Sequence, residues 1–223
     1  MTNDSFFATL PVMKNLFLAL LATLLLTGCA GQTEKPPDAN SVLYFPETGR
    51  SIQQPFSSYF QQRGGARLLG YPITEALDHE GWRVQYFQNG RLEVHPENQP
   101  DYFITVGWLG ELSNRTQPPI PKPLNESSRY FPESGHSLSG DFLTFFEANG
   151  DTAQFGRPIS EAFLCDGYLC QDFQSARFIW RPQLSPANRV QLEALGELYF
   201  LNSDLPPSLL SPVSPPPVNH PEN

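Results

Sequence analysis

Two short segments of the chain carry aromatic residues at helical spacing. In each segment three rings occupy positions i, i+3 and i+4, which places them on one face of a helix. The rings are Phe56, Tyr59 and Phe60 in the first segment and Phe142, Phe145 and Phe146 in the second. We therefore predict helices over residues 55–63 and 141–149, packed on a core by these faces. Gly64 and Gly150 follow directly and predict where the helices end.

Strand-like alternation follows each predicted helix and is punctuated by turn residues. Glu80-Gly81 and Asp166-Gly167 are typical dipeptides of two-residue hairpin loops, and Asn89-Gly90 predicts a further turn. Strands are therefore expected over residues 76–79, 82–87, 91–95, 162–165, 168–173 and 177–181. Further helical turns are expected over residues 106–112 and 189–200. The predicted fold class is α+β, with short helices packed on small antiparallel sheets.

The two patterned regions are similar in sequence at an offset of 86 residues. Residues 44–112 align without a gap to residues 130–198, with 25 of 69 positions identical. The block Tyr-Phe-Pro-Glu-Thr-Gly at 44–49 returns as Tyr-Phe-Pro-Glu-Ser-Gly at 130–135. This register indicates two tandem repeats, which a pseudo-twofold axis could relate. A single repeat is small for an independent domain, so we expect the two to be in contact, although a proline-rich linker could also hold them apart.

The N-terminal region has the apolar pattern of a lipoprotein signal peptide. Leu16 to Leu26 is an apolar run of about eleven residues, and a membrane-spanning helix needs roughly 20. The run follows Lys14 and ends in Leu26-Thr27-Gly28-Cys29, a lipobox at which cleavage and lipidation occur. We therefore expect a lipid anchor on Cys29 and an extracytoplasmic location, at the cell membrane or at an outer membrane.

These signals give a predicted organisation in six parts. The parts are a signal peptide over residues 1–28, a flexible tether over 29–41, the first repeat over 42–116, a Pro-rich linker over 117–127, the second repeat over 128–203, and a disordered Pro-rich tail over 204–223.

Charge and cysteine content narrow the classes of partner. The formal net charge is −9, and phosphate backbones repel so acidic a chain, so we expect no nucleic-acid partner. With Cys29 lipidated, only Cys165 and Cys170 remain, and outside the cytoplasm such a pair predicts a disulfide rather than free thiols or a metal site. The four histidines are scattered, so we expect no metal and no cofactor.

Part of each repeat resembles the LGFP repeat of envelope and secreted bacterial proteins. In the first repeat the resemblance is carried by Leu69-Gly70-Tyr71-Pro72, Glu75, Gly81, Phe87 and Gly90. In the second it is carried by Gly156, Pro158, Glu161, Gly167 and Phe173, with departures at Phe155 and Ala176. The resemblance implies a non-catalytic role at the cell wall.

Catalytic chemistry has little support in the sequence. Glu75 and Glu161 recur after the turn of each repeat. A residue that recurs in a repeat is expected first of all to be needed for the fold, here by binding a backbone amide or by pairing with Arg91 or Arg177. Neither a nucleophile elbow nor a phosphate-binding loop is recognisable. We therefore predict that the chain is not an enzyme and has no catalytic residues, with a glycosidase-like hydrolase as the weaker alternative.

Aromatic rings beside amides favour a carbohydrate ligand, because flat apolar faces stack on sugar rings and amides bind hydroxyls. The candidate ligand-binding residues are Trp82, Gln85, Tyr86, Trp108, Tyr168, Gln171 and Trp180. The alternative for each aromatic ring is a place in the core of a small domain, and we expect Trp82 and Tyr168, next to the hairpin turns, to be the most exposed of the rings. We expect a lipid-anchored binding module for peptidoglycan or another surface glycan. The alternative is a protein–protein adaptor or accessory subunit of an envelope complex.

Overall fold

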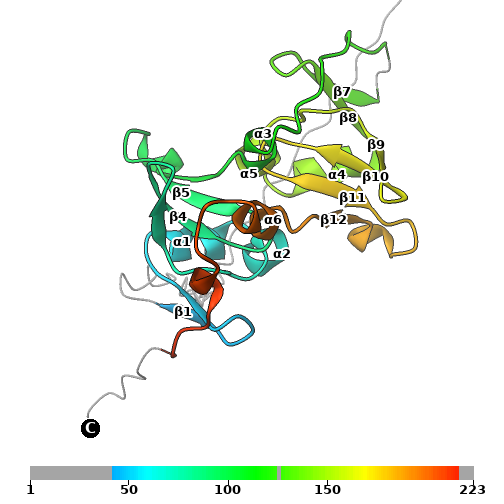
Figure 1. Cartoon of the computed structure of the whole chain (residues 1–223). Helices are drawn as coiled ribbons and strands as arrows, with labels where there is room; N and C mark the ends of the chain where they lie inside the picture. The colour runs from blue at the N-terminus through cyan, green and yellow to red at the C-terminus, as the bar shows by residue number, and fades with distance from the viewer. Residues whose placement is uncertain (1–41, 125–126, 216–223) are drawn as a thin grey trace, which may run out of the picture. The chain divides into compact units, whose positions relative to one another are not determined.

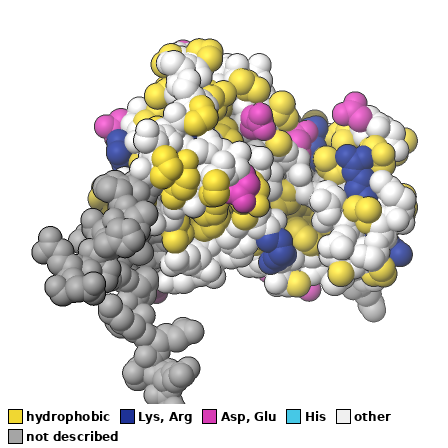
Figure 2. Space-filling view, turned by 90° about the horizontal axis from the view of Figure 1, so that it is seen from below, with side chains coloured by type: hydrophobic (Ala, Val, Ile, Leu, Met, Phe, Trp, Pro, Cys, Tyr) yellow, Lys and Arg dark blue, Asp and Glu magenta, His cyan; other side chains and the backbone are white. Residues whose placement is uncertain are grey.

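The computed structural model describes residues 42–124 and 127–215, which form an α+β fold of short helices and small antiparallel sheets (Figure 1). The predicted signal peptide, Cys29 and the tether lie outside these residues. Within the described ranges, no helix is long and apolar enough to span a membrane. On the face seen in Figure 2, apolar side chains are scattered over the surface, and Lys, Arg, Asp and Glu side chains are few.

The first repeat begins with a hairpin, continues with two short helices and ends in a four-stranded sheet followed by a helical turn. Its elements are β1 (Leu43–Phe45), β2 (Arg50–Ile52), α1 (Phe56–Gln62), α2 (Gly65–Leu69), β3 (Leu77–His79), β4 (Trp82–Tyr86), β5 (Arg91–Val94), the 3-10 helix η1 (Pro100–Tyr102), β6 (Ile104–Val106) and α3 (Leu109–Leu112). The strand order of the larger sheet is β3-β4-β5-β6.

The second repeat has the same succession of elements. They are β7 (Ser128–Phe131), β8 (His136–Ser139), α4 (Gly140–Ala148), α5 (Asp151–Phe155), β9 (Phe163–Cys165), β10 (Tyr168–Asp172), β11 (Arg177–Trp180), η2 (Pro186–Asn188), β12 (Val190–Leu192) and α6 (Leu195–Leu201). Its sheet has the order β12-β11-β10-β9, and a last 3-10 helix, η3 (Pro207–Leu210), follows α6.

Local sequence signals account for the hairpins and for the ends of the first helices. Both residues of each predicted hairpin dipeptide have positive φ, as the tight turns between β3 and β4 and between β9 and β10 require. Gly64 and Gly150 adopt left-handed conformations after α1 and α4. The predicted helices and these hairpins are therefore confirmed.

Each repeat contributes an aromatic core between its helices and its sheet. Phe56 and Phe60 on α1 pack with Leu92 of β5, and Phe142 and Phe146 on α4 belong to the corresponding cluster of the second repeat. Tyr59 and Phe145 are partly buried against the same clusters. The aromatic helix faces are thus core, as their spacing predicted.

The repeats contact each other through reciprocal hydrogen bonds. The backbone N–H of Glu111 in α3 donates to the carbonyl of Gln174 (3.3 Å), and the N–H of the aligned Glu197 in α6 donates to the carbonyl of Gln88 (3.0 Å). The N–H of Gly110 also donates to the Gln174 carbonyl (2.8 Å). A Cβ on Gly110 would collide with the carbonyl oxygen of Phe173, so the close approach of these turns requires glycine there. Aligned residues thus make equivalent bonds across this contact.

Several sequence-based expectations were wrong in detail. Residues 104–106 and 190–192, close to or inside predicted helical segments, form strands because they pair with β5 and β11. The five-residue helices α2 and α5 were missed, since each begins directly after the glycine that ends the preceding helix. The expected disorder of the tail is wrong for residues 204–215: η3 is helical, and the Val213 N–H donates to the Gly49 carbonyl (2.9 Å). Residues 216–223 of the predicted tail and residues 125–126 of the predicted linker lie outside the described residues.

Candidate functional site

The first repeat has a groove of about 450 Å³ on its sheet, between two tryptophan side chains. Trp82 begins β4 directly after the hairpin turn, and Trp108 precedes the first residue of α3. The groove is lined by Glu80, Trp82, Arg91, Glu93, His95, Asn98, Thr105, Val106, Trp108 and Leu112. Two aromatic rings thus lie beside carboxylate, amide and hydroxyl groups in one groove.

The two rings differ in how firmly they are held. Trp82 is half-buried and its ring lies 4.0 Å from that of His95, centroid to centroid. His95 is fixed in turn by contacts of its ring nitrogens with Glu93 (3.0 Å) and Glu97 (2.9 Å). Trp108 leaves 50% of its surface exposed, so its face is available to a ligand.

A buried arginine forms the polar base of the groove. Arg91 is 1% exposed and donates to the carboxylate of Glu93 (Nε–Oε1 2.8 Å), to Glu80 (2.7 Å) and to the hydroxyl of Tyr86 (2.9 Å). Burial alone lowers the pKa of a guanidinium, but the charge of Glu93 and these hydrogen bonds raise the pKa of Arg91 above its usual value. The arginine is therefore a fixed cation that orients both carboxylates.

Glu80 joins this base to the second repeat. Its carboxylate accepts a hydrogen bond from the Tyr199 hydroxyl of α6 (2.6 Å). Burial would raise the pKa of Glu80, but the hydrogen bonds from Tyr199 and Arg91 outweigh it and leave the pKa below its ordinary value. Burial and the bond to Glu80 raise the pKa of Tyr199. At neutral pH Glu80 is thus ionised and Tyr199 is the donor.

The groove continues into neighbouring hollows on both sides. Trp108, Val106 and Thr105 also line a hollow of about 320 Å³ that reaches Tyr102 and, in the second repeat, Arg157. In the other direction, Glu80 and Leu112 border a more polar hollow of about 500 Å³ against α6. The groove thus shares lining residues with two neighbouring hollows.

Three of the predicted ligand-binding residues are buried structural groups. Gln85 donates to the carbonyls of Ser51 (2.7 Å) and Thr74 (2.9 Å), and Gln171 makes the corresponding bonds to Ser137 and Ser160. Tyr86 is 0% exposed in a core cluster. Their proposed contact with a ligand is therefore corrected. The two glutamines hold each opening hairpin to its sheet, and Tyr86 packs in the core against Phe200.

The second repeat places its predicted rings differently. The Tyr168 ring is covered by the guanidinium of Arg181, 3.6 Å from its centroid. Trp180 packs against the core, donates from Nε1 to Asp141 (2.8 Å) and borders a separate hollow of about 250 Å³. Neither ring therefore joins the groove of the first repeat.

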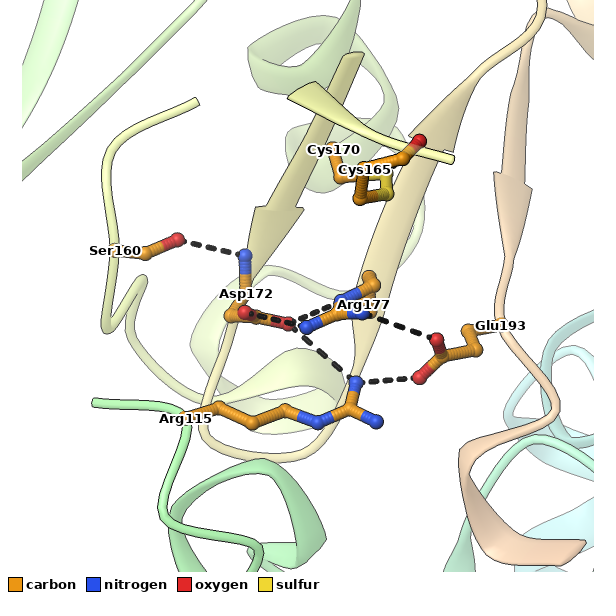
Figure 3. Close-up of a disulfide and its surroundings, with 7 residues drawn as sticks. All are labelled: Arg115, Ser160, Cys165, Cys170, Asp172, Arg177 and Glu193. Carbon is orange, nitrogen blue, oxygen red and sulfur yellow. Dashed lines mark hydrogen bonds and ion pairs between the residues drawn. A yellow bond between two sulfur atoms is a disulfide. The ribbon is translucent and has the colours of Figure 1, made fainter. Parts of the chain in front are cut away.

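The predicted disulfide between Cys165 and Cys170 is present and joins β9 to β10 (Figure 3). The cysteines are not directly opposite, because Cys165 pairs with Tyr168 and Cys170 with Phe163. In the same region Arg177 binds Asp172 through two hydrogen bonds (2.6 and 2.9 Å) and Glu193 through one (3.2 Å). Figure 3 shows Arg115, from the linker side of the first repeat, completing this ion-pair network on Glu193.

Glu75 and Glu161 bind backbone amides, although those of the opening hairpins rather than those of the nearby turns. Glu75 accepts from the Ser51 N–H and Glu161 from the Ser137 N–H, each at 2.8 Å. The expected pairing with Arg91 and Arg177 is wrong, since those arginines bind other carboxylates.

Sequence reasoning selected both tryptophans of the groove but missed its polar residues. The missed residues include Glu80, Glu93, His95, Asn98 and Thr105. A usable signal was their lack of recurrence: Asn98 aligns with Leu184 and His95 with Arg181. Positions that differ between repeats of one fold are free of the common packing constraints, so they are candidates for a specific role.

Among the described residues, no group of three or more His, Cys, Asp or Glu side chains could hold a metal ion. No protein-family model matches the sequence, and no curated protein is detectably similar to it.

Proposed function

We propose that the chain is a non-catalytic binding module, tethered to a membrane through a lipid on Cys29, whose groove between Trp82 and Trp108 binds a glycan chain of the cell envelope. The observation that carries the proposal is the pairing of a half-exposed Trp108 with Trp82 above a fixed set of polar groups. The resemblance of the turn motif to LGFP repeats adds an envelope role to this proposal.

The chemistry of the groove suits a polyhydroxylated ligand. An indole face binds the apolar C–H face of a sugar ring, and oriented carboxylates and amides accept or donate hydrogen bonds at its rim. Glu93 and Glu80 are already oriented by Arg91, so binding costs little side-chain entropy. The neighbouring hollows extend the contact surface, which favours a polymer over a single sugar.

The electrostatics favour binding without catalysis. A glycosidase uses one carboxylic acid, with a raised pKa, as proton donor. In the groove the pKa of Glu80 is instead lowered by Tyr199 and Arg91, which keeps this carboxylate ionised. Glu75 and Glu161 bind backbone N–H groups of the hairpins. If the chain were a glycosidase, Glu75→Gln would abolish its hydrolysis of a glycan. We expect neither the wild type nor this variant to hydrolyse one.

The proposal is tested by retention of the purified chain on isolated cell-wall sacculi. Trp108→Ala should weaken retention about tenfold, because an aromatic contact contributes about 1–1.5 kcal/mol and 1.4 kcal/mol is a factor of ten. Leu164→Ala is the matched control, since Leu164 is exposed on β9, away from the groove. Absence of retention, or equal retention of both variants, contradicts the proposal.

A second candidate function is a protein–protein adaptor, which an apolar patch near the contact of α3 and α6 favours. Leu112 on α3 is 50% exposed, and on α6 Leu198 and Leu201 are 40% and 57% exposed. Such side chains suit a protein partner. Leu201→Glu should abolish co-purification with that partner from detergent extracts and leave retention on sacculi unchanged.

A further inference from the structure

The Tyr-Phe-Pro-Glu-Thr/Ser-Gly motif plays no part in the groove, yet it forms the same docking geometry in both repeats. We call the hairpin formed by β1 and β2, with Tyr44, Gly49 and Arg50, the first seat. The hairpin formed by β7 and β8, with Tyr130, Gly135 and His136, is the second seat. An extended segment from the far end of the other repeat lies on each seat.

The second seat holds the linker through the backbone of Ile120. The Ile120 N–H donates to the carbonyl of Gly135 (2.8 Å), and its own carbonyl accepts from the hydroxyl of Tyr130 (3.0 Å). A ring nitrogen of His136 contacts the carbonyl of Gln117 (3.2 Å). Both backbone groups of one residue are thereby satisfied, as in the addition of a strand.

The first seat holds the tail in the same way. The Val213 N–H donates to the carbonyl of Gly49 (2.9 Å), and its carbonyl accepts from the hydroxyl of Tyr44 (3.5 Å). Arg50, which aligns with His136, donates to the carbonyl of Leu209 (2.6 Å). The Tyr44 bond is longer than the Tyr130 bond and lies at an exposed position, so Val213 is held less firmly on its seat than Ile120 is.

In both occupants a proline stands immediately before the paired residue and lies against the glycine of the seat. The ring of Pro212 packs on Gly49 and that of Pro119 packs on Gly135, so closely that a Cβ on either glycine would collide with the ring. Both glycines have positive φ, which few other residues tolerate. In both occupants the residue after this proline is β-branched, Ile120 or Val213.

The two occupants do not follow the register of the repeats. Positions 120 and 213 are 93 residues apart, which is seven more than the offset of 86 that relates the seats. Connections of different length therefore arrive at the same contacts. The chemistry of the seat, rather than the spacing of the chain, selects the bound segment.

We propose that this hairpin is a peptide-binding site for an extended segment in which Pro precedes Val or Ile. In this chain the linker and the tail fill the two sites. The first seat, with the weaker bond to its occupant, accepts such a segment from another polypeptide whenever the tail leaves. The site is independent of the tryptophan groove and of a glycan ligand.

The test measures binding of a fluorescent peptide with the sequence of residues 206–215 to the full chain by polarisation. In the wild type the tethered tail competes, whereas Val213→Asp in the chain removes this competitor. We expect the Val213→Asp chain to bind the peptide about tenfold more tightly than the wild type. Adding Tyr44→Phe and Gly49→Ala should remove this gain. Tyr130→Phe, the matched change in the filled second seat, should leave it intact.

A control peptide with Asp in place of Val and Ala in place of the preceding Pro should not bind. The proposal is overturned if the folded Val213→Asp chain binds the peptide no better than the wild type does, or binds both peptides equally. Retention on sacculi depends on Trp108 and is read in a separate assay. A failed glycan experiment therefore leaves this result unaffected.

Discussion

The first and second repeats have an arginine at the same aligned position, buried in the first repeat and partly buried in the second, but its charge is neutralised from different strands. Arg91 is neutralised by Glu93 on its own strand β5, and Arg177 by Asp172 and by Glu193, which directly follows β12. Glu93 aligns with Ile179, and Glu193 aligns with Gly107. A Cβ on Gly107 would collide with the carboxylate of Glu93. A repeat can therefore hold a glutamate at the position of Glu93 or at the position of Glu193, but not at both.

The two repeats also differ in what surrounds this arginine. In the first repeat Trp108, His95 and Asn98 border an open groove, and the aligned residues of the second repeat are Ala194, Arg181 and Leu184. By contrast, the buried Gln85 and Gln171 make the same hydrogen bonds in both. Most residues that recur maintain the fold, whereas most residues that line the candidate site differ between the repeats. Arg91 and Leu112 are the exceptions, since they line the groove and also recur.

The largest expected effect concerns the contact between the repeats. A Cβ at Gly196 would collide with the backbone of Phe87 and Gly90, so Gly196→Ala should lower the free energy of unfolding by about 3 kcal/mol or more. Gly167→Ala is the control, because only its positive φ, and no neighbouring atom, opposes a side chain, at roughly 1–2 kcal/mol. Urea denaturation measures both. Equal losses would mean that the repeats do not touch at this point.

The next largest effect concerns whether the two ways of neutralising the arginine can replace each other. Glu93→Ile should cost about 3 kcal/mol, because it leaves the buried Arg91 without its closest carboxylate. Adding Gly107→Glu reproduces the arrangement of the second repeat and should recover about half of that loss. A double-mutant cycle of unfolding free energies measures the coupling. If the losses in unfolding free energy from the two substitutions are simply additive, the two positions of the glutamate are not equivalent.

Removing the disulfide of the second repeat should lower the stability less. The first repeat has His79 and Val84 at the aligned positions, so the fold does not require the bond. Its loop is short, so replacing both cysteines by serine should cost about 2 kcal/mol or less. Reduction of the wild type should lower the melting temperature similarly and leave retention on sacculi unchanged. A global loss of folding would contradict this expectation.

The smallest effect is the acid dependence contributed by Glu80. Its pKa in the folded chain is below the ordinary 4.5, so its stabilising contribution is present above that pH and is lost as the pH falls below it. The side chain is 38% exposed, and after allowance for solvent screening about 0.5 kcal/mol is expected. Glu80→Gln should flatten the fall in stability as the pH drops below the ordinary pKa of the carboxyl group. Leu164→Ala, a change at an exposed residue on β9, should leave that fall unchanged.

The sequence predicted those elements that depend on neighbours within a few residues. The aromatic helix faces and the hairpin dipeptides follow from side-chain periodicity and from backbone dihedral preferences, which are local properties. The short strands β6 and β12 could not be predicted in this way, because three-residue apolar segments become strands only through pairing with β5 and β11.

From the sequence alone came the recurrence of one pattern, the candidate tryptophans and the cysteine pair. Tertiary structure decided which polar residues are buried, because burial depends on residues far away in sequence. The Gln85 side chain was predicted to bind a ligand, but in the fold it donates to the carbonyls of Ser51 and Thr74. It also decided that a tail rich in proline is ordered as far as Pro215, since the first repeat supplies the hydrogen-bond partners that the tail lacks by itself.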